Sequence, residues 1–398
     1  MAAPNATRPN IYAHIVGWGM AVPERCMTND DIAAIVETSD EWIRARTGIH
    51  TRYIANERET TALLGLRAAR EALEVADILP IEVDLIICAT STPEHIFPST
   101  ASIIQDMLGA SKAGAFDLSA ACSGFVYALQ TAAQMIRSGA IQTAIVIGAE
   151  TMSRILDWQD RSTCILFGDG AGAVVLHGRA DAGGLMSAVL RSDGSGRDLL
   201  DLPSVGSLDV NRPDLINREH QTYKLYMEGG EVFKFGTRVI GESVRQACDI
   251  AGISITDLKL IVPHQANERI IHAAARALKL EPDVFMLNLD KYGNTSAASI
   301  PIALCEAAQQ ERLQQGDYMA MVGFGGGLAW GAVVVQWSGV PEPKRFGTQR
   351  RQFIYLTAAG RQRIRTFLRR ISETFNRIRP QRGRLQRLRR NIDKIDDE

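Results

Sequence analysis

Cys122 is the residue of this sequence best placed to act as a nucleophile. It follows residues 115–121, which form an apolar stretch ending in small residues, and it precedes a helical pattern over residues 125–136. A thiol at a helix N-terminus lies near unpaired backbone N–H groups and the positive end of the helix dipole, so the thiolate is expected to be favoured. The small neighbours Ser123 and Gly124 leave room for a substrate. This segment alone also fits a buried, inert cysteine, which is the commoner role of a free cysteine.

Two polar residues further along the chain could complete an active site. His264 follows the apolar run 258–263, and Asn294 lies in a turn with Gly293. An imidazole and a carboxamide can stabilise an oxyanion beside an activated thiol. Considered singly, a histidine after a strand is typical of a structural residue, and an asparagine beside glycine is typical of a turn. The chemistry therefore depends on whether the fold brings the three side chains together.

The hydrophobic pattern predicts the elements that would position these residues. Continuous apolar runs favour strands buried on both faces, and amphipathic runs that follow Ser or Thr caps favour helices. Strands are expected at 11–21, 83–90, 143–150 and 167–176, and helices are expected to open at Thr28 and Ser39 and to span 60–75 and 99–108. This mixture predicts the α/β class.

The sequence also contains an internal repeat. Residues 76–87 align with residues 251–262, and residues 121–129 with residues 296–304, both at an offset of 175 positions. The segment 172–176 resembles 331–335 in the same order. We interpret this as a duplicated domain, in which each half is an α/β layer with a mostly parallel sheet. Equivalent turns of the two halves would then converge at strand ends, where α/β proteins place ligands.

The composition of the 398 residues limits the function classes. No run of 18 apolar residues is present, and the N-terminal region lacks a signal-peptide pattern. The six cysteines show no paired spacing, which indicates a reducing, cytoplasmic location and neither a disulfide framework nor a zinc site. We find no metal cluster, phosphate loop or nucleotide fingerprint, so we expect no bound cofactor and no metal.

The last 58 residues differ from the rest. Residues 341–398 carry 17 Lys or Arg and 6 Asp or Glu, whereas residues 1–340 carry 27 and 39. After a proline-containing linker, apolar residues recur at helical spacing between Ile364 and Ile378 and again between Leu385 and Ile395, with Pro380 and Gly383 between them. This predicts a pair of basic amphipathic helices. They could dock on the acidic body, bind an anionic membrane, an acidic carrier protein or nucleic acid, or be largely disordered.

Several motifs in the right order resemble the 3-oxoacyl-[acyl-carrier-protein] synthase III family, the initiating condensing enzymes of type II fatty acid synthesis, which have the thiolase fold. The resemblance covers about residues 10–338. It implies duplicated αβαβα layers with mostly parallel mixed sheets, with an N-terminal half at residues 10–180 and a C-terminal half at residues 181–338. Its strongest motifs are Ser119-Ala-Ala-Cys122-Ser-Gly-Phe, Pro263-His264-Gln-Ala-Asn267, Tyr292-Gly-Asn294-Thr-Ser-Ala-Ala-Ser and Gly323-Phe-Gly-Gly-Gly-Leu-Ala-Trp330-Gly. The second cysteine of thiolases and the second histidine of elongating synthases are missing.

The resemblance implies a decarboxylative Claisen condensation of an acyl-CoA primer with malonyl-acyl carrier protein. Cys122 would carry the acyl group, and His264 and Asn294 would stabilise the enolate that forms when carbon dioxide leaves. The backbone N–H of Gly326 would contribute to the oxyanion hole with that of Cys122, and Phe324 would shape the decarboxylation site.

The resemblance also implies binding residues and partners. Trp42 and Arg161 would sandwich the CoA adenine, with Thr38 and Arg46 nearby. Phe97 matches the residue with which a partner subunit closes the acyl pocket, so a homodimer and a short, acetyl-like primer are expected. The carrier-protein patch would consist of Lys234, Arg269 and Arg276, although Ala277 replaces a second usual lysine and Glu268 adds a negative charge. We hypothesise that the basic tail supplements this patch.

Three other functions fit parts of the sequence. A thiolase-fold enzyme of secondary metabolism could join or transfer acyl groups without decarboxylation. A papain-like hydrolase shares the order Cys, His, Asn, but the sequence lacks the motif around its cysteine. A third class is a catalytically inactive scaffold protein that acts through its tail. Such a protein would be expected to lack one of the three residues Cys122, His264 and Asn294, but all three are present.

Overall fold

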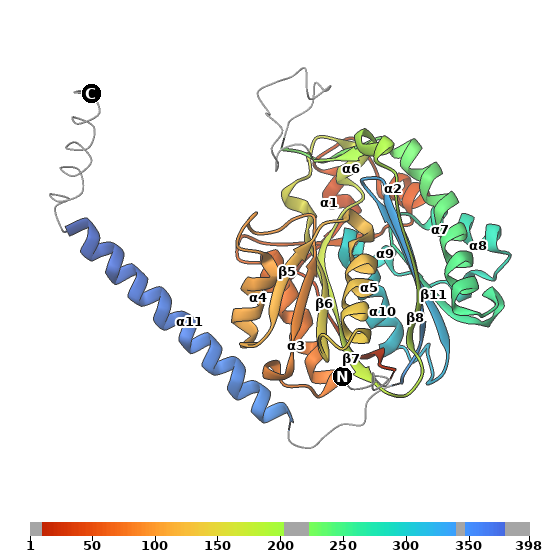
Figure 1. The fold of residues 1–398 in the computed structure, drawn as a ribbon. Helices are drawn as coiled ribbons and strands as arrows, with labels where there is room; N and C mark the ends of the chain where they lie inside the picture. The colour runs from red at the N-terminus through yellow and green to blue at the C-terminus, as the bar shows by residue number, and fades with distance from the viewer. Residues whose placement is uncertain (1–9, 203–222, 340–346, 379–398) are drawn as a thin grey trace, which may run out of the picture.

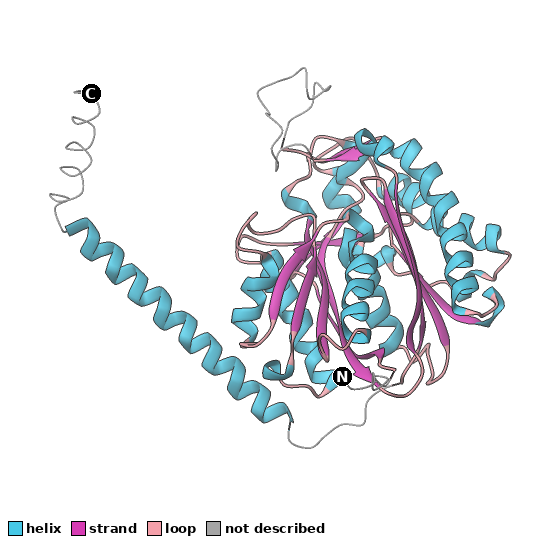
Figure 2. Cartoon of the chain, viewed as in Figure 1, coloured by secondary structure: helices cyan, strands magenta, loops and turns pink. Residues whose placement is uncertain are grey.

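The structure is a computed structural model that describes residues 10–202, 223–339 and 347–378. The two larger β-sheets lie face to face with helices between them, and further helices cover the outer face of each of these sheets (Figures 1 and 2). This is the layered arrangement expected from the repeat together with the family resemblance. It places the ends of both sheets around one central region.

The first sheet contains five strands. Their order is β1 (Tyr12–Ala21), β7 (Asp169–Arg179), β6 (Thr143–Thr151), β4 (Leu85–Ala89) and β5 (Gly114–Leu118). The second sheet has the corresponding order β8 (Gly184–Ser192), β13 (Ala329–Gln336), β12 (Tyr318–Gly325) and β11 (Leu258–Pro263). The strands expected from the apolar runs are all present within these bounds, give or take a few residues.

Both sheets are mixed, with less parallel pairing than the sequence suggested. β4 pairs in parallel with β5 and β6, and β11 with β12. The pairs β1–β7, β6–β7, β12–β13 and β8–β13 are antiparallel. The short connection between β12 and β13 is compatible with their antiparallel pairing, because antiparallel neighbours need no crossover helix.

The helices fall into an inner and an outer set. The inner helices are α5 (Gly124–Arg137) and α10 (Ser299–Gln309), which pack between the sheets. The outer helices α3 (Thr61–Ala76) and α4 (Thr100–Leu108) cover the first sheet, and α7 (Gly229–Ala251) and α8 (Glu268–Leu278) cover the second. The sequence predicted α3 and α4 to within one residue at each end.

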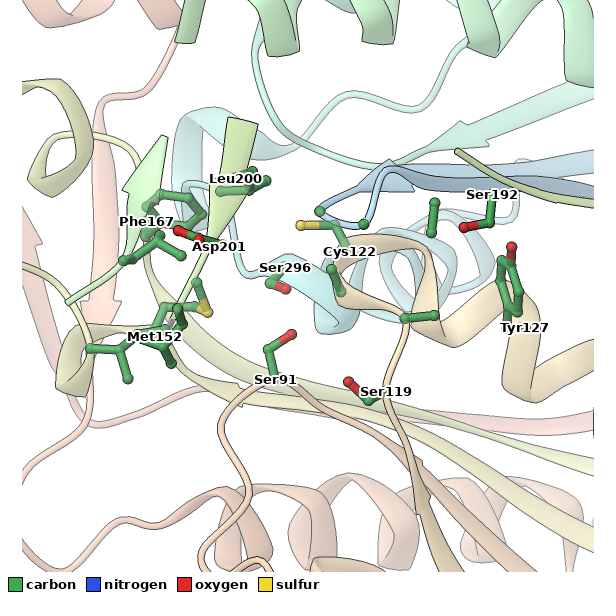
Figure 3. A pocket seen from close by; sticks show the side chains of 18 residues that line it. Ser91, Ser119, Cys122, Tyr127, Met152, Phe167, Ser192, Leu200, Asp201 and Ser296 are labelled. Atoms are coloured by element: carbon green, nitrogen blue, oxygen red, sulfur yellow. The ribbon is translucent and has the colours of Figure 1, made fainter. Parts of the chain in front are cut away.

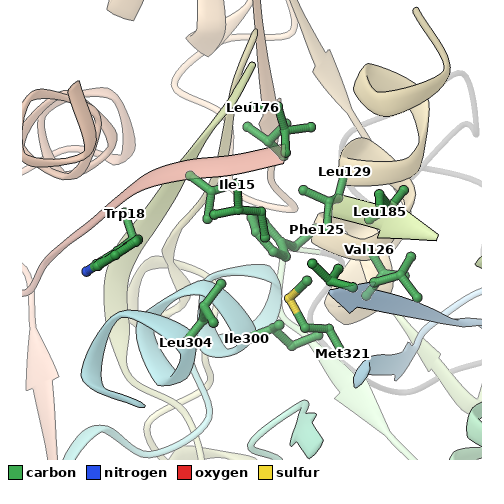
Figure 4. Packing of buried hydrophobic residues seen from close by; sticks show 14 of the residues in the cluster. Ile15, Trp18, Phe125, Val126, Leu129, Leu176, Leu185, Ile300, Leu304 and Met321 are labelled. Carbon is green, nitrogen blue, oxygen red and sulfur yellow. The ribbon is translucent and has the colours of Figure 1, made fainter. Parts of the chain in front are cut away.

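The inner helices and the facing strands form the central core. Phe125 and Leu129 of α5 pack near Ile300 and Leu304 of α10 and near Ile15 of β1 (Figure 4). All five side chains are buried. This core fixes the N-terminal ends of α5 and α10 relative to each other, and those ends carry the candidate site.

The repeat is visible in local backbone geometry. Ala121 and Ser296, which are 175 positions apart, both have positive φ angles, of 46° and 49°. Each begins a short 3₁₀ turn, Ala121–Ser123 or Ser296–Ala298, that leads directly into α5 or α10. Positive φ is uncommon outside glycine, so the same unusual turn at equivalent positions supports the duplication.

Smaller elements cover the strand ends near the candidate site. As predicted, helices open at Thr28 and Ser39, whose side chains accept hydrogen bonds from the N–H groups of Asp31 and Trp42. The small elements are β2 (Arg25–Thr28), α1 (Asn29–Ala33), α2 (Asp40–Thr47), β3 (Thr51–Ile54), α6 (Arg161–Cys164), β9 (Leu200–Asp201), β10 (Tyr226–Met227) and α9 (Leu289–Tyr292).

The tail contains one long helix, α11 (Gly347–Ile378), which begins well before the expected first helix. The expected linker at Pro341 and the expected second helix between Leu385 and Ile395 lie outside the described residues. The N-terminal half of α11 docks beside α3 and α4 (Figure 1). Within the described residues, no helix combines the length and the apolar character needed to span a membrane.

Candidate active site

The turn between β5 and α5 presents Cys122. Its side chain is only 6% exposed, and its sulfur points into a cavity (Figure 3). The neighbouring strand β12 passes very close: a Cβ atom at Gly325 would lie 2.7 Å from the Cys122 backbone nitrogen. Only glycine fits this approach, which brings the β12–β13 loop alongside the thiol.

Burial changes the expected state of the thiol. It raises the pKa of Cys122 to about 12, and a hydrogen bond with the Ser296 side chain opposes this only in part. The prediction of a favoured thiolate is therefore wrong for the free protein, because desolvation disfavours the charged form of the thiol. Cys122 is a thiol at neutral pH and must lose its proton as it reacts.

His264 is held at the end of β11. Its backbone N–H donates to the Val322 carbonyl at 2.8 Å, and its Nδ1 lies 2.7 Å from the Ser299 hydroxyl. Burial lowers the pKa of His264 to about 3, so the ring is neutral at physiological pH. When Ser299 donates to Nδ1, the single ring proton is on Nε2, which can then donate to a ligand. The Phe324 ring meets the imidazole edge-on, with 5.3 Å between centroids.

Asn294 is oriented by its own turn. Its Oδ1 accepts a hydrogen bond from the Ser296 N–H at 2.9 Å, and its backbone N–H donates to the Leu166 carbonyl at 2.8 Å. The Oδ1 contact fixes the amide plane, so the Nδ2 group serves as a donor. The side chain is buried.

The structure brings the three predicted residues together. Cys122, His264 and Asn294 line one cavity of about 300 Å³, together with Phe324 and Gly325. Cys122 also lines a second cavity of about 420 Å³, whose wall includes Gly326 (Figure 3). The thiol therefore stands where two cavities meet. A thiol, a neutral imidazole and an amide in this arrangement can support acyl transfer and the stabilisation of an oxyanion.

One buried carboxylate near the site was missed by the sequence analysis. Glu150, at the end of β6, accepts hydrogen bonds from Thr92 Oγ1 at 2.6 Å, from the Ser91 N–H at 3.0 Å and from the Ala297 N–H at 3.4 Å. Burial raises its pKa, and these hydrogen bonds oppose the shift. Because Ala297 lies in the turn before α10, Glu150 ties the two halves together beside Cys122. The sequence did contain a signal for this residue, because Glu150 is a charged residue at the end of an otherwise apolar strand.

Two of the four residues expected to bind CoA line the 300 Å³ cavity. Trp42 and Arg46 line it, whereas Thr38 and Arg161 do not. The Arg161 guanidinium lies 4.9 Å from the Trp42 ring centroid and that of Arg46 lies 5.5 Å away. Arg161 and Trp42 are thus in contact with each other, so an adenine could enter between them only if they separate. The Thr38 hydroxyl is buried and has no hydrogen-bond partner among the described residues.

Phe97 lies apart from these cavities. It is 85% exposed and lines neither cavity around Cys122 of its own chain. Ile96 beside it is also exposed. The structure of one chain therefore does not bring Phe97 to the site, and any role as a gate requires a second chain.

The expected carrier-protein patch lies on α7 and α8. Lys234 pairs with Glu231 at 2.7 Å, and the Arg269 guanidinium lies over the Phe233 ring at 5.4 Å. Arg276 is exposed in the last turn of α8. Sequence analysis missed Arg245, whose guanidinium donates to the Ala277 carbonyl at 2.7 Å and so places a positive charge where the patch lacked one.

The tail does not adjoin this patch in the same chain. α11 lies on the side of α3 and α4, whereas α7 and α8 lie on the opposite side of the molecule (Figure 1). The hypothesis that the tail supplements the patch is therefore not supported by the arrangement of the described residues.

In the part of the chain that the structure describes, no group of three His, Cys, Asp or Glu side chains could hold a metal ion.

Comparisons with known proteins agree with this fold. Residues 116–194 match the family model for 3-oxoacyl-[acyl-carrier-protein (ACP)] synthase III, and residues 248–337 match the model for its C-terminal part. Beta-ketoacyl-[acyl-carrier-protein] synthase III of Roseiflexus sp. strain RS-1 is 49% identical over 327 residues, which cover 82% of this chain and 99% of that protein.

Solved structures give the same result. The 3-oxoacyl-[acyl-carrier-protein] synthase III of Aquifex aeolicus VF5 has a TM-score of 0.76 and 44% identity over 82% of this chain and 100% of its own. The priming β-ketosynthase of the R1128 polyketide pathway has a TM-score of 0.77 and 34% identity, covering 85% and 100%. The fold and site thus define a thiolase-type condensing acyltransferase. Within that class, the chain belongs to the 3-oxoacyl-[acyl-carrier-protein] synthase III family.

Proposed function

We propose that this protein condenses a short acyl-CoA primer with malonyl-acyl carrier protein, giving 3-oxoacyl-acyl carrier protein, carbon dioxide and CoA, and so initiates fatty acid synthesis. The observation that carries the proposal is that Cys122, His264 and Asn294, from different parts of the chain, line one cavity. The residue roles below are part of the proposal.

The first step is acyl transfer to Cys122. The sulfur attacks the thioester carbonyl, the bond to the CoA sulfur breaks, and the thiol proton ends on the departing CoA thiol. The backbone N–H groups of Cys122 and Gly326 stabilise the tetrahedral oxyanion. Because the free thiol has a raised pKa, proton loss must accompany the attack.

The second step is decarboxylation and carbon–carbon bond formation. Malonyl-acyl carrier protein loses carbon dioxide, and the electrons of the broken bond form an enolate. Nε2–H of His264 and Nδ2–H of Asn294 donate to the enolate oxygen, a role for which a neutral imidazole is suitable. The apolar Phe324 ring disfavours the malonyl carboxylate and so promotes its loss. The enolate carbon then attacks the acyl carbonyl, the bond from the acyl carbon to the Cys122 sulfur breaks, and the released thiolate takes up a proton from solvent.

Substrate binding involves two separate surfaces. Trp42 and Arg161 part to hold the CoA adenine, with Arg46 and Thr38 beside them. Lys234, Arg269 and Arg276, supplemented by Arg245, attract the acidic carrier protein. The exposed Phe97 closes the acyl pocket of a second subunit in a homodimer, which limits the primer to a short chain.

The organisation of the protein follows from these roles. Residues 10–180 supply the nucleophile, residues 181–338 supply His264 and Asn294, and residues 341–398 form an extension. No cofactor is required, since the thioester substrates carry the reactive groups. All six cysteines are free, which supports a reducing, cytoplasmic location.

Two measurements test the proposal. After incubation with acetyl-CoA, intact-mass analysis should show one added acetyl group, about 42 Da, on Cys122 and none on Cys122→Ser. Addition of carboxyl-labelled malonyl-acyl carrier protein should then release labelled carbon dioxide in proportion to product. An acetylated enzyme that forms a product without releasing label would contradict decarboxylation and favour another condensing reaction.

A further inference from the structure

The helix α11 has one face that is anchored to the body. Arg351 forms a buried ion pair with Asp77 at 2.5 Å. The Tyr355 ring lies under the Arg70 guanidinium at 4.6 Å, and Ala358 is only 2% exposed. Further along, Arg365 donates to Asp106 Oδ1 at 2.6 Å. These contacts fix the rotation of the helix about its axis.

The opposite face of α11 is apolar and exposed. At about 100° per residue, most of its residues point roughly 140–160° away from Arg351, and Leu368 lies at the edge of the face, about 100° from Arg351. Ile364 is 60% exposed and Phe367 63% exposed, although large apolar side chains usually avoid water. We call this face the apolar stripe; it consists of Phe353, Leu356, Ile364, Phe367, Leu368 and Ile371.

Arginines flank the stripe. Residues 347–378 contain eight arginines and a single acidic residue, Glu373. Arg361 and Arg363 are exposed and fall on either side of the stripe on a helical wheel. Beyond Arg365, the helix continues for roughly 20 Å at 1.5 Å per residue, and it projects away from the body (Figure 1).

We propose that the apolar stripe of α11 binds the surface of a membrane that contains anionic lipids. A helix of this kind lies in the plane of the interface, with its apolar face among the acyl chains and its arginines at the headgroups. The anionic headgroups attract the arginines, so the binding depends on both lipid charge and salt. The anchored face keeps the stripe turned outward, away from the body.

Charge and position favour this occupant over two others. Two copies that packed stripe to stripe would bring two rows of arginines together without acidic partners. An acidic carrier protein would be expected at the patch on α7 and α8, which lies on the opposite side of the molecule from α11 (Figure 1). The match to the family model ends at residue 337, before α11 begins. The inference therefore goes beyond the proposed condensation.

Vesicle sedimentation of the full chain tests the proposal. Vesicles made of equal parts phosphatidylglycerol and phosphatidylcholine should carry the protein down, and pure phosphatidylcholine vesicles should bind it at least about tenfold less tightly. High salt should weaken the binding. The double variant Phe367→Ser/Leu368→Ser should lose most of it. Ile250→Ser, which removes an equally exposed apolar side chain from α7, should retain it.

Other results would overturn the proposal. They are absence of binding to the anionic vesicles, equal binding to both vesicle types, and unchanged binding by the double variant. If light scattering showed a smaller assembly for the double variant than for the wild type, the stripe would bind a second copy of the chain. If the double variant had a higher KM for malonyl-acyl carrier protein, the stripe would bind the carrier protein. Acetylation of Cys122 in solution should be the same for the double variant and the wild type, so failure of vesicle binding and failure of the proposed reaction can be distinguished.

Discussion

The Ser299 hydroxyl lies 2.7 Å from Nδ1 of His264, although the two residues belong to different elements, the start of α10 and the end of β11. When the hydroxyl donates to Nδ1, the ring proton is on Nε2. In that tautomer, Nε2–H is the group that can donate to the proposed enolate.

Removal of this hydroxyl should impair the second half-reaction selectively. Ser299→Ala should lower the decarboxylation rate by about two- to tenfold, the equivalent of one hydrogen bond. The rate of Cys122 acetylation should change little, because that step does not depend on the His264 tautomer. Single-turnover measurements with acetyl-CoA and with malonyl-acyl carrier protein separate the two. Equal losses in both steps would argue against a role through His264.

The raised pKa of Cys122 predicts how its reactivity depends on pH. Since the folded-state pKa is about 12, the thiolate fraction should rise about tenfold per pH unit from pH 7 to pH 10 without a plateau. Alkylation by iodoacetamide, followed by peptide mass analysis, measures this directly. Cys26, which is exposed, provides an internal reference for an accessible thiol. A plateau of Cys122 reactivity below pH 9 would instead support an activated thiolate.

Gly325 should be intolerant of even a methyl group. In Gly325→Ala, the new Cβ would lie 2.7 Å from the Cys122 backbone nitrogen, so the strand or the turn must shift. We expect a destabilisation of about 1–3 kcal/mol and at least a tenfold loss of acetylation rate. Gly360→Ala in α11 is a matched control, because no described heavy atom other than those of its chain neighbours and of the nearby backbone of its own helix lies within 4 Å of the point that its new Cβ would occupy. It should keep full activity and match or slightly exceed wild-type stability.

Arg161 should contribute to the binding of acyl-CoA more than to the chemistry. Its stacking on an aromatic ring is worth about 0.5–2 kcal/mol. Arg161→Ala should therefore raise KM for acetyl-CoA by roughly two- to thirtyfold with kcat nearly unchanged. Arg44→Ala removes an arginine that pairs with Asp40 on α2, and it should have little effect. A large fall in kcat for Arg161→Ala would contradict this assignment.

Arg245 should act together with Arg276 in binding the carrier protein. Charge reversal in Arg245→Glu should raise KM for malonyl-acyl carrier protein several-fold, most strongly at low salt, because exposed charges act mainly through long-range attraction. KM for acetyl-CoA should not change. Lys112→Glu, a reversal in the turn after α4 and far from this patch, is the control. If both variants raised KM equally, a general charge effect would explain the result.

Much of the fold could be predicted from the sequence. The buried strands, the caps at Thr28 and Ser39 and the repeat at an offset of 175 all depend on local patterns, since strand and helix periodicity and capping involve residues close in sequence. Cys122, His264 and Asn294 could be proposed as site candidates from their types and their places at predicted strand ends and turns, and the family resemblance added the role expected of each. The pairing directions within the sheets were less evident, because apolar runs look alike in parallel and antiparallel buried strands.

Only the tertiary structure decided how these residues behave. The pKa of Cys122 is set by the surfaces that bury it, the role of Glu150 by Ser91 and Ala297 from distant segments, and the contact of Arg161 with Trp42 by two separate loops. The exposed stripe of α11 likewise depends on which face the body covers. The sequence by itself determined which groups are present and which local structures carry them. Desolvation, hydrogen-bond partners and docking arise between residues far apart in the chain, so the folded structure alone determines them.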